Sequence, residues 1–264
     1  MRQSVLTDYT ITGKGPAVFL THGVGSRRSV WEKVVRHLAP HFRCIAYDLR
    51  GHAGGAPADM TFGLDEFVAD LEAVRQQLGV EKAHFVGHSL GGMIVPAYAA
   101  AHSSHIKSVG LISTVAFRGD EARAGMANFV KKLDYGGTSA VVETLLDRWF
   151  TNDFRRRNPD IIAARKAQVL ELESRVYRET YNVYATADVG PLLSKIKAPA
   201  LVMTGEFDPS CGPAPNTKMA EALPRGELMI LPDLRHSLLI EAPDIVGPAL
   251  LNFLKSVESL DKEH

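Results

Sequence analysis

Short apolar runs alternate with helix-like segments along most of this chain, and that alternation limits the fold more than any other feature. Runs rich in β-branched residues predict strands at 17–21, 43–47, 83–86, 108–112, 200–204 and 227–231. Their apolar residues are continuous, which is typical of strands covered on both faces. Because strands that alternate with helices form parallel sheets, the sequence predicts an α/β fold with a mostly parallel central sheet flanked by helices.

Helical periodicity fills the gaps between these strands. Apolar residues recur at the i, i+3, i+4, i+7 spacing over 64–78, and a glycine follows where a helix would end. Residues 90–101 are apolar nearly all round, which predicts a helix buried against the sheet, and 243–260 predicts an amphipathic helix. The opening residues 5–12 predict one or two antiparallel strands at the edge of the sheet.

The alternation stops once, between Thr114 and Pro199. This part has no strong strand pattern, and helix-like stretches occupy 126–133, 139–149, 159–173 and 177–184. Because the strand pattern resumes at residue 200, we interpret the stretch as a helical insertion and not as an independent domain. The prediction is a core domain made of 1–115 and 195–264, with the insertion at 116–194.

The strongest local motif is Gly87-His88-Ser89-Leu90-Gly91, which lies after a predicted strand and before a predicted helix. A sharp strand-to-helix turn holds a serine side chain clear of the sheet, and the flanking glycines let neighbouring backbone pass closely. The helix that begins at Leu90 adds the positive end of its dipole. Ser89 is therefore the candidate nucleophile.

A serine nucleophile needs a base to take its proton and an acid to orient that base. Asp208 lies in the loop after the strand at 200–204, and His236 lies in the loop after the strand at 227–231. Active sites of parallel sheets lie at the carboxyl edge, where these loops and Ser89 are expected to meet. Asp208 and His236 are therefore the candidate acid and base.

Other acids and histidines fit these roles less well. Glu206 and Asp233 lie near the same edge, but each is closer to its strand than a loop acid should be. His84 lies within a strand and His88 lies beside the nucleophile, so packing or a backbone hydrogen bond explains both. The histidines at helix ends or turns are expected to be solvated: His37, His41, His102 and His105.

Acyl transfer also needs backbone donors for the negative oxygen of the intermediate, and losing one donor costs about 3–4 kcal/mol. The segment His22-Gly23-Val24-Gly25 follows the first long strand, and its glycines allow a loop that turns N–H groups toward Ser89. We predict the N–H groups of Val24 and Leu90 as these donors. His22 is expected to fix the loop by hydrogen bonding.

With these motifs in order, the chain resembles the α/β-hydrolase superfamily. Five blocks carry the resemblance: His22-Gly23, Asp48-Leu49-Arg50-Gly51-His52, Gly87-His88-Ser89-Leu90-Gly91-Gly92, Gly205-Glu206-Phe207-Asp208, and His236 with Glu241-Ala242-Pro243. Within the superfamily it is most similar to small cytosolic esterases, enol-lactonases and carbon–carbon bond hydrolases of aromatic catabolism. The resemblance implies a Ser89, Asp208 and His236 triad, a helical cap at about 116–194, and no cofactor.

Two positions depart from the pattern of the superfamily. Members usually read Gly-x-Ser after the histidine of the second block, whereas this chain reads Ala53-Gly54-Gly55-Ala56 after His52, which predicts a reshaped turn. A small residue usually precedes the catalytic histidine, but Arg235 stands here. Its cation indicates a contact with an acidic substrate or with the cap.

Composition excludes several classes of partner. Thirty Lys and Arg residues balance thirty Asp and Glu residues, and the longest basic run, 155–157, is interpreted as a solvated helix end. Neither feature is typical of nucleic-acid binding. Cys44 and Cys211 have no metal-ligand spacing and are too few for a disulfide framework. No apolar stretch has the length of a signal peptide core or a membrane span, so we expect a cytoplasmic protein without a membrane partner.

The sequence therefore predicts a serine hydrolase of small carboxylic esters, lactones or amides, with water as the second reactant. Two alternatives stay open: cleavage of a carbon–carbon bond in a vinylogous diketone by the same triad, and a ligand-sensing protein that uses the scaffold for signalling. The candidate pocket residues are Trp149, Phe150 and Tyr181 as aromatic walls, and Arg27 and Arg28 for a substrate carboxylate. A solvated approach to the helix at Trp31 is the simpler interpretation of the two arginines.

Overall fold

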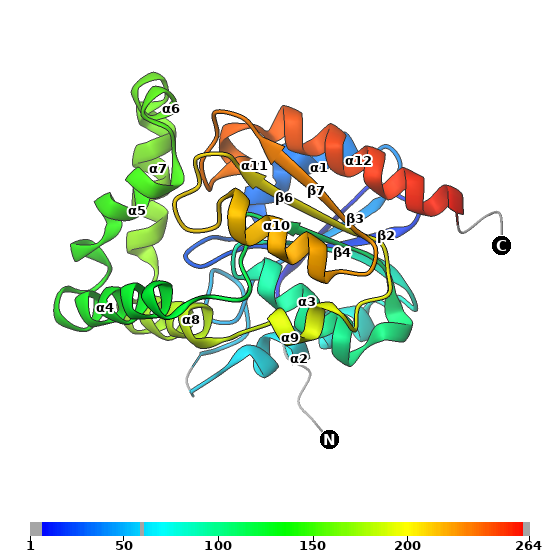
Figure 1. Ribbon diagram of the computed structural model, residues 1–264, viewed down its shortest axis with the longest axis horizontal. Helices are drawn as coiled ribbons and strands as arrows, with labels where there is room; N and C mark the ends of the chain where they lie inside the picture. The colour runs from blue at the N-terminus through cyan, green and yellow to red at the C-terminus, as the bar shows by residue number, and fades with distance from the viewer. Residues whose placement is uncertain (1–6, 59–60, 261–264) are drawn as a thin grey trace.

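The computed structural model describes residues 7–58 and 61–260. Within them, seven strands form one sheet in the order β1-β3-β2-β4-β5-β6-β7 (Figure 1). Only β1 among the described strands pairs antiparallel, against β3, so the predicted mostly parallel sheet is confirmed. The strands are β1 (Tyr9–Thr12), β2 (Ala17–Thr21), β3 (Arg43–Tyr47), β4 (Ala83–His88), β5 (Ile106–Ile112), β6 (Ala200–Gly205) and β7 (Gly226–Leu231).

All six strands predicted between residues 17 and 231 are present, with ends that differ by two residues at most; the last of them, β7, lies at the edge of the sheet opposite β1. One edge strand, β1, lies within the predicted stretch 5–12; residues 5 and 6 of that stretch lie outside the described residues. The inner strands β2 and β4 are buried along their whole length, as expected for strands covered on both faces.

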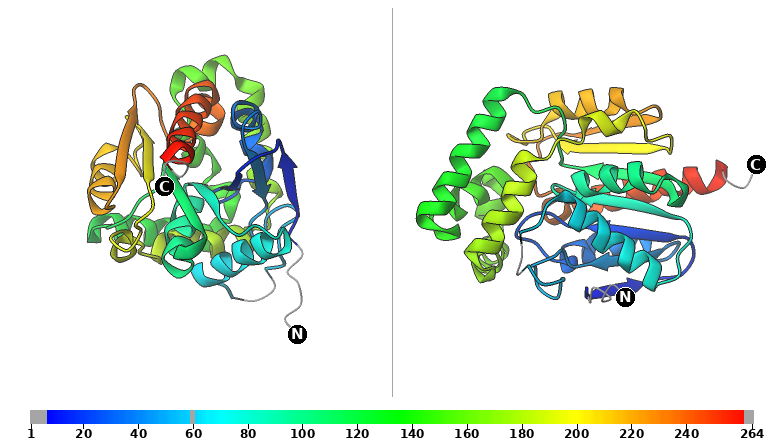
Figure 2. Two further views of the ribbon diagram at one scale, coloured as in Figure 1. Left: turned by 90° about the vertical axis from the view of Figure 1, so that its right-hand side faces the viewer. Right: turned by 90° about the horizontal axis from the view of Figure 1, so that it is seen from below.

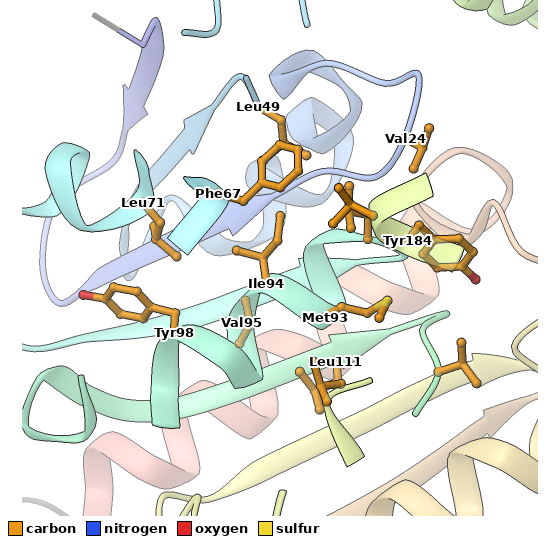
Figure 3. Close-up of a cluster of buried hydrophobic side chains, with 14 of the residues drawn as sticks. Val24, Leu49, Phe67, Leu71, Met93, Ile94, Val95, Tyr98, Leu111 and Tyr184 are labelled. Atoms are coloured by element: carbon orange, nitrogen blue, oxygen red, sulfur yellow. The ribbon is translucent and has the colours of Figure 1, made fainter. Parts of the chain in front are cut away.

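Helices cover both faces of the sheet (Figures 1 and 2). One face packs against α1 (Glu32–Leu38), α11 (Leu238–Glu241) and α12 (Pro243–Leu260). The other face packs against α2 (Leu64–Gln77), α3 (Gly91–Ala101), α9 (Gly190–Leu193) and α10 (Pro213–Ala222). Figure 3 shows how Phe67 and Leu71 of α2 face Ile94 and Tyr98 of α3 in this second layer.

Between β5 and β6, a stretch described throughout, the chain forms helices and no strand, and we call this stretch the insertion. Its helices are α4 (Asp120–Gly136), α5 (Val142–Trp149), α6 (Asn152–Arg157), α7 (Pro159–Glu171), α8 (Ser174–Thr186) and α9. Helices α4 to α8 gather at one end of the sheet (Figures 1 and 2). Their apolar side chains join the cluster that covers the α2 and α3 face, and Tyr184 of α8 and Val24 lie together at its end (Figure 3).

Three short helices were not predicted: α9, α10 and α11. The basic run 155–157 forms the last turn of α6, in agreement with its interpretation as a helix end. No helix among residues 7–58 and 61–260 is long and apolar enough to cross a bilayer.

Candidate active site

Ser89 lies on a tight turn between β4 and α3. Its φ angle is +56°, a left-handed conformation that non-glycine residues rarely adopt. The turn requires glycines on both sides of Ser89. A Cβ on Gly87 would lie 2.1 Å from the carbonyl oxygen of Gly91, and a Cβ on Gly91 would lie 2.2 Å from the carbonyl oxygen of Thr21. The sequence thus holds Ser89 in a strained position at the end of the central strand.

His236 and Asp208 form a buried pair at the same edge of the sheet. His236 Nδ1 lies 2.7 Å from Asp208 Oδ2, and Asp208 Oδ1 accepts hydrogen bonds of 2.9 Å from the backbone N–H groups of Ser210 and Cys211. Burial opposes charge on both groups. The opposite charge and the shared hydrogen bond outweigh burial, so the pKa of Asp208 falls below its usual value and the pKa of His236 rises well above its own.

The alternative acids lie apart from this pair. The carboxylate of Glu206 accepts a 3.2 Å hydrogen bond from the backbone N–H of Asp233, and both residues are exposed. His88, in turn, uses its Nε2 in a 3.0 Å hydrogen bond to the backbone carbonyl of His236, the kind of role expected from the sequence. Asp208 is therefore the acid that contacts His236.

A cavity of about 60 Å³ lies between this edge and the insertion, and both Ser89 and His236 line it. The core side of its wall includes Gly23, Val24 and His88. The insertion supplies Leu145, Arg148 and Trp149 from α5, Arg165 from α7, and Tyr177, Tyr181 and Tyr184 from α8. The cavity is smaller than the ~300–1,000 Å³ typical of ligand sites.

The loop after β2 passes close to Ser89. A Cβ on Gly23 would lie 2.8 Å from the Cβ of Ser89. Within the described part of the chain, the N–H groups of Val24 and Leu90 donate to no protein acceptor. Two free donors beside a serine are what an oxyanion site requires.

Two buried histidines hold this loop in place. His22 Nε2 accepts from the N–H of Leu49 at 3.0 Å, so its Nδ1–H donates to the carbonyl of Gly23 at 2.8 Å. His52 Nε2 accepts from the N–H of Gly25 at 3.0 Å, and its Nδ1–H donates to the carbonyl of Arg50. Burial lowers the pKa of His22 well below its usual value and that of His52 to about 4, so both stay neutral.

Three residues expected in the pocket do not line this cavity. Arg27 pairs with Glu171 at 2.7 Å. Arg28 pairs with the buried carboxylate of Asp48. Phe150 is fully buried and stacks on Phe154 with ring centroids 5.5 Å apart, so it belongs to the core of the insertion.

Trp149 and Tyr181, by contrast, contribute to the cavity wall. Arg235 does not: its guanidinium donates to the backbone carbonyls of Asp147 and Phe150, the latter at 3.2 Å. The sequence suggested that Arg235 contacts either an acidic substrate or the cap, and in the structure it contacts the insertion.

Sequence reasoning missed Arg148, Arg165 and the tyrosines at 177 and 184 of the cavity wall. The helical pattern of the sequence predicted the helices that carry these residues, but it did not predict which face of each helix points toward Ser89. Potential metal ligands also come together here, since ligand atoms of Asp208, Cys211 and His236 lie within 4.8 Å of one another. The mutual hydrogen bond of Asp208 and His236 already occupies two of them.

Comparison with known proteins assigns the chain to a family. Residues 16–243 match the family model described as the alpha/beta hydrolase fold. The chain belongs to this family. Its central strand, tight turn and following helix carry Ser89 where the glycine motif of the family predicts a nucleophile.

Several relatives of this chain are enol-lactonases or esterases. The chain is 25% identical over 255 residues to the 3-oxoadipate enol-lactonase 2 of Acinetobacter baylyi, which covers 96% of this chain and 94% of that protein. It is 31% identical over 236 residues to the pimeloyl-[acyl-carrier protein] methyl ester esterase of Chromobacterium violaceum, with 85% and 89% covered. The crystal structure of an enol-lactonase from Burkholderia xenovorans superposes with a TM-score of 0.87 at 29% identity, over 94% of this chain and 96% of that one.

Proposed function

We propose that the protein is a cofactor-free serine hydrolase of small carboxylic esters or lactones, and that Ser89, His236 and Asp208 form its catalytic triad. The observation that carries the proposal is the shared cavity: Ser89 on its strained turn faces the same hollow as His236, which Asp208 holds at 2.7 Å. The enol-lactonase and esterase relatives favour the same class of substrate.

In this mechanism the Ser89 hydroxyl attacks the substrate carbonyl and its proton passes to Nε2 of His236. The ring must be neutral to accept that proton, and because Asp208 raises the pKa of His236, the fraction of molecules able to react increases with pH. The negative oxygen of the tetrahedral intermediate accepts hydrogen bonds from the N–H groups of Val24 and Leu90. His236 then protonates the leaving oxygen, which leaves an acyl group on Ser89. A water molecule, deprotonated by His236, hydrolyses that ester and frees the acid.

Asp208 orients His236 and stabilises the imidazolium that forms when the proton arrives. Because Asp208 binds the Nδ1 side of the ring, Nε2 is left for the serine and the leaving group. The two backbone N–H groups that bind Oδ1 keep the carboxylate ionised, since they favour its charged form.

We also propose that the insertion at 116–194 is a cap on a core domain formed by 1–115 and 195–264. Residues of α5, α7 and α8 make up much of the cavity wall, and the apolar side chains of the insertion are continuous with those of the core. Both cysteines are free and buried, and we place the reaction in the reducing cytoplasm on that ground.

A fluorophosphonate probe and a substrate panel test the function together. The purified protein should hydrolyse p-nitrophenyl acetate and an enol-lactone, and mass spectrometry should find the probe on Ser89. Ser89→Ala should lose both properties, whereas Ser103→Ala, a change at an exposed serine, should keep them.

The same panel separates the alternatives. A protein that cleaves only a vinylogous diketone would be a carbon–carbon bond hydrolase. Tight retention of a ligand with less than one turnover would favour a sensor. Absence of both labelling and hydrolysis would refute the serine mechanism.

A further inference from the structure

Arg165 of α7 carries a positive charge inside the protein without an acidic partner. The residue is only 8% exposed. Its Nη1 donates to the carbonyl of Gly25 and, at 3.2 Å, to the side chain of Gln168, and its guanidinium lies 4.6 Å from the ring centroid of Trp149. Among the described residues no carboxylate lies within ion-pair distance of it.

Other arginines of the insertion are mostly paired. Six have a carboxylate partner: Arg123, Arg155, Arg156, Arg157, Arg175 and Arg178. Of the three described arginines without one, Arg118 stacks on Tyr184 and does not line the cavity, whereas Arg148 and Arg165 both line it. The unpaired cations thus gather at the proposed active site.

This cavity has no acidic counterpart for those cations. No Asp or Glu among the described residues lines its wall. Burial lowers the pKa of Arg165 to about 10, which still leaves the guanidinium charged at neutral pH. A buried charge is unfavourable unless it is paired, so the wall favours an anion that enters with the ligand.

Arg165 also borders a second hollow through which such a ligand can extend. A groove of about 640 Å³ runs between α7 and the segment after the β2 loop, and its wall includes Arg165. The groove shares Val30, Arg165, Leu239 and Ile240 with the cavity at Ser89. Arg165 therefore lies at the boundary between the proposed reacting centre and the larger outer space.

We propose that Arg165 is a specificity-determining residue that binds a second carboxylate of the substrate, so that the preferred substrates are esters or lactones that carry a free acid group. Nη1 of Arg165 is bound to Gly25, next to the proposed oxyanion donor Val24, so a short spacer suffices between the two carbonyl carbons. The Nε–H and Nη2–H groups of Arg165 donate to no described protein atom and supply a fork for a carboxylate. This inference rests on the proposed function.

Two esters of equal length test the specificity. Mono-p-nitrophenyl glutarate carries the free carboxylate, and p-nitrophenyl valerate has a methyl group in its place. We expect the wild-type protein to prefer the glutarate ester. Arg165→Gln should lower kcat/KM for that ester about 30- to 100-fold more than it lowers kcat/KM for the valerate ester, mainly through KM. Arg156→Gln, at a paired surface arginine of α6, is the control and should change neither.

A binding measurement keeps the test independent of turnover and of the folding of one variant. Calorimetric titration of glutarate into the wild-type protein should give binding, which Arg165→Gln abolishes and Arg165→Lys weakens because lysine keeps the charge but lacks the fork. An unchanged preference in both variants, or no binding of glutarate to the wild-type protein, overturns the inference. Inorganic phosphate that competes as well as glutarate would also overturn it, because the site would then be a general anion site.

The two proposals fail in different ways. If neither ester is hydrolysed but glutarate binds through Arg165, the serine mechanism is wrong and the carboxylate site stands. If both esters are hydrolysed at rates that do not depend on Arg165, the mechanism stands and the carboxylate site is wrong.

Discussion

Acid should destabilise this protein well above the pH at which its carboxylates titrate, because three histidines are buried in neutral form. His22 and His52 hold the loop after β2, and His88 binds the backbone carbonyl of His236. Burial lowers the pKa of His22 well below its usual value, that of His52 to about 4 and that of His88 to about 3. In the unfolded chain all three regain a value near 6.5.

The magnitude follows from proton linkage. When the pH falls from 7.5 to 5.5, each of these histidines takes up a proton in the unfolded chain but not in the folded one, which removes about 1.4 kcal/mol of stability per residue. His236 acts in the opposite sense. Its pKa is raised in the folded chain, so folded His236 keeps a proton that the unfolded chain loses above pH 6.5. The stabilising contribution of His236 is therefore fully present below pH 6.5, and lowering the pH from 7.5 to 5.5 adds at most about 1.4 kcal/mol of stability through this residue. The net expected loss is about 3–4 kcal/mol, a large part of the ~5–15 kcal/mol of an ordinary domain.

Urea unfolding followed by tryptophan fluorescence at pH 7.5, 6.5 and 5.5 measures this loss. His52→Gln should lower stability at every pH but reduce its dependence on pH by about 1.4 kcal/mol over the interval, since one buried neutral histidine is gone. His41→Gln, at an exposed histidine, is the matched control. Equal or greater stability at pH 5.5 than at pH 7.5 would refute the reasoning.

Three further predictions concern the site. Ser89→Ala should lower kcat by roughly 10⁵–10⁶ while the melting temperature changes little, measured by ester hydrolysis and calorimetry. Asp208→Asn should lower kcat by about 10³–10⁴ because it misorients the base; near-normal activity in this variant together with a dead Glu206→Gln would mean that the acid is wrongly assigned. Trp149→Ala should change the ratio of kcat/KM between two esters of unequal acyl size, whereas Phe150→Ala should leave that ratio alone and lower stability by about 3–5 kcal/mol, measured by urea unfolding.

The sheet could be predicted because its strands have a strong local signal. Buried parallel strands need continuous apolar residues, and inner strands such as β2, β4 and β6 are buried along their whole length. The helices α9 and α10 lacked such a signal: α9 has only four residues, and α10 begins at Pro213 with few apolar positions. Short helices are stabilised by tertiary packing more than by their own sequence, so local patterns underestimate them.

The positions of Ser89, Asp208 and His236 could be predicted for a topological reason. In a parallel sheet every strand ends at the same edge, so the loops after β4, β6 and β7 come together whatever their separation in sequence. Knowing the strand ends was therefore enough to expect Asp208 near His236, and the structure has the two side chains 2.7 Å apart. Their catalytic roles stay predictions until the variants are measured.

The cavity wall contributed by the insertion could not be predicted in the same way. Consecutive residues of a helix point about 100° apart, so Trp149 lines the cavity while Phe150, just past the end of α5, is buried among the insertion helices. Only the way α5 and α7 dock on the core decides which side chain faces Ser89. The same holds for charge: in sequence Arg165 resembles its many basic neighbours, and Arg27 stands closer to the oxyanion loop. What sets Arg165 apart is where the docking of α7 puts its guanidinium, which lies 4.6 Å from the ring centroid of Trp149 with no ion pair among the described residues, a non-local outcome that only packing determines.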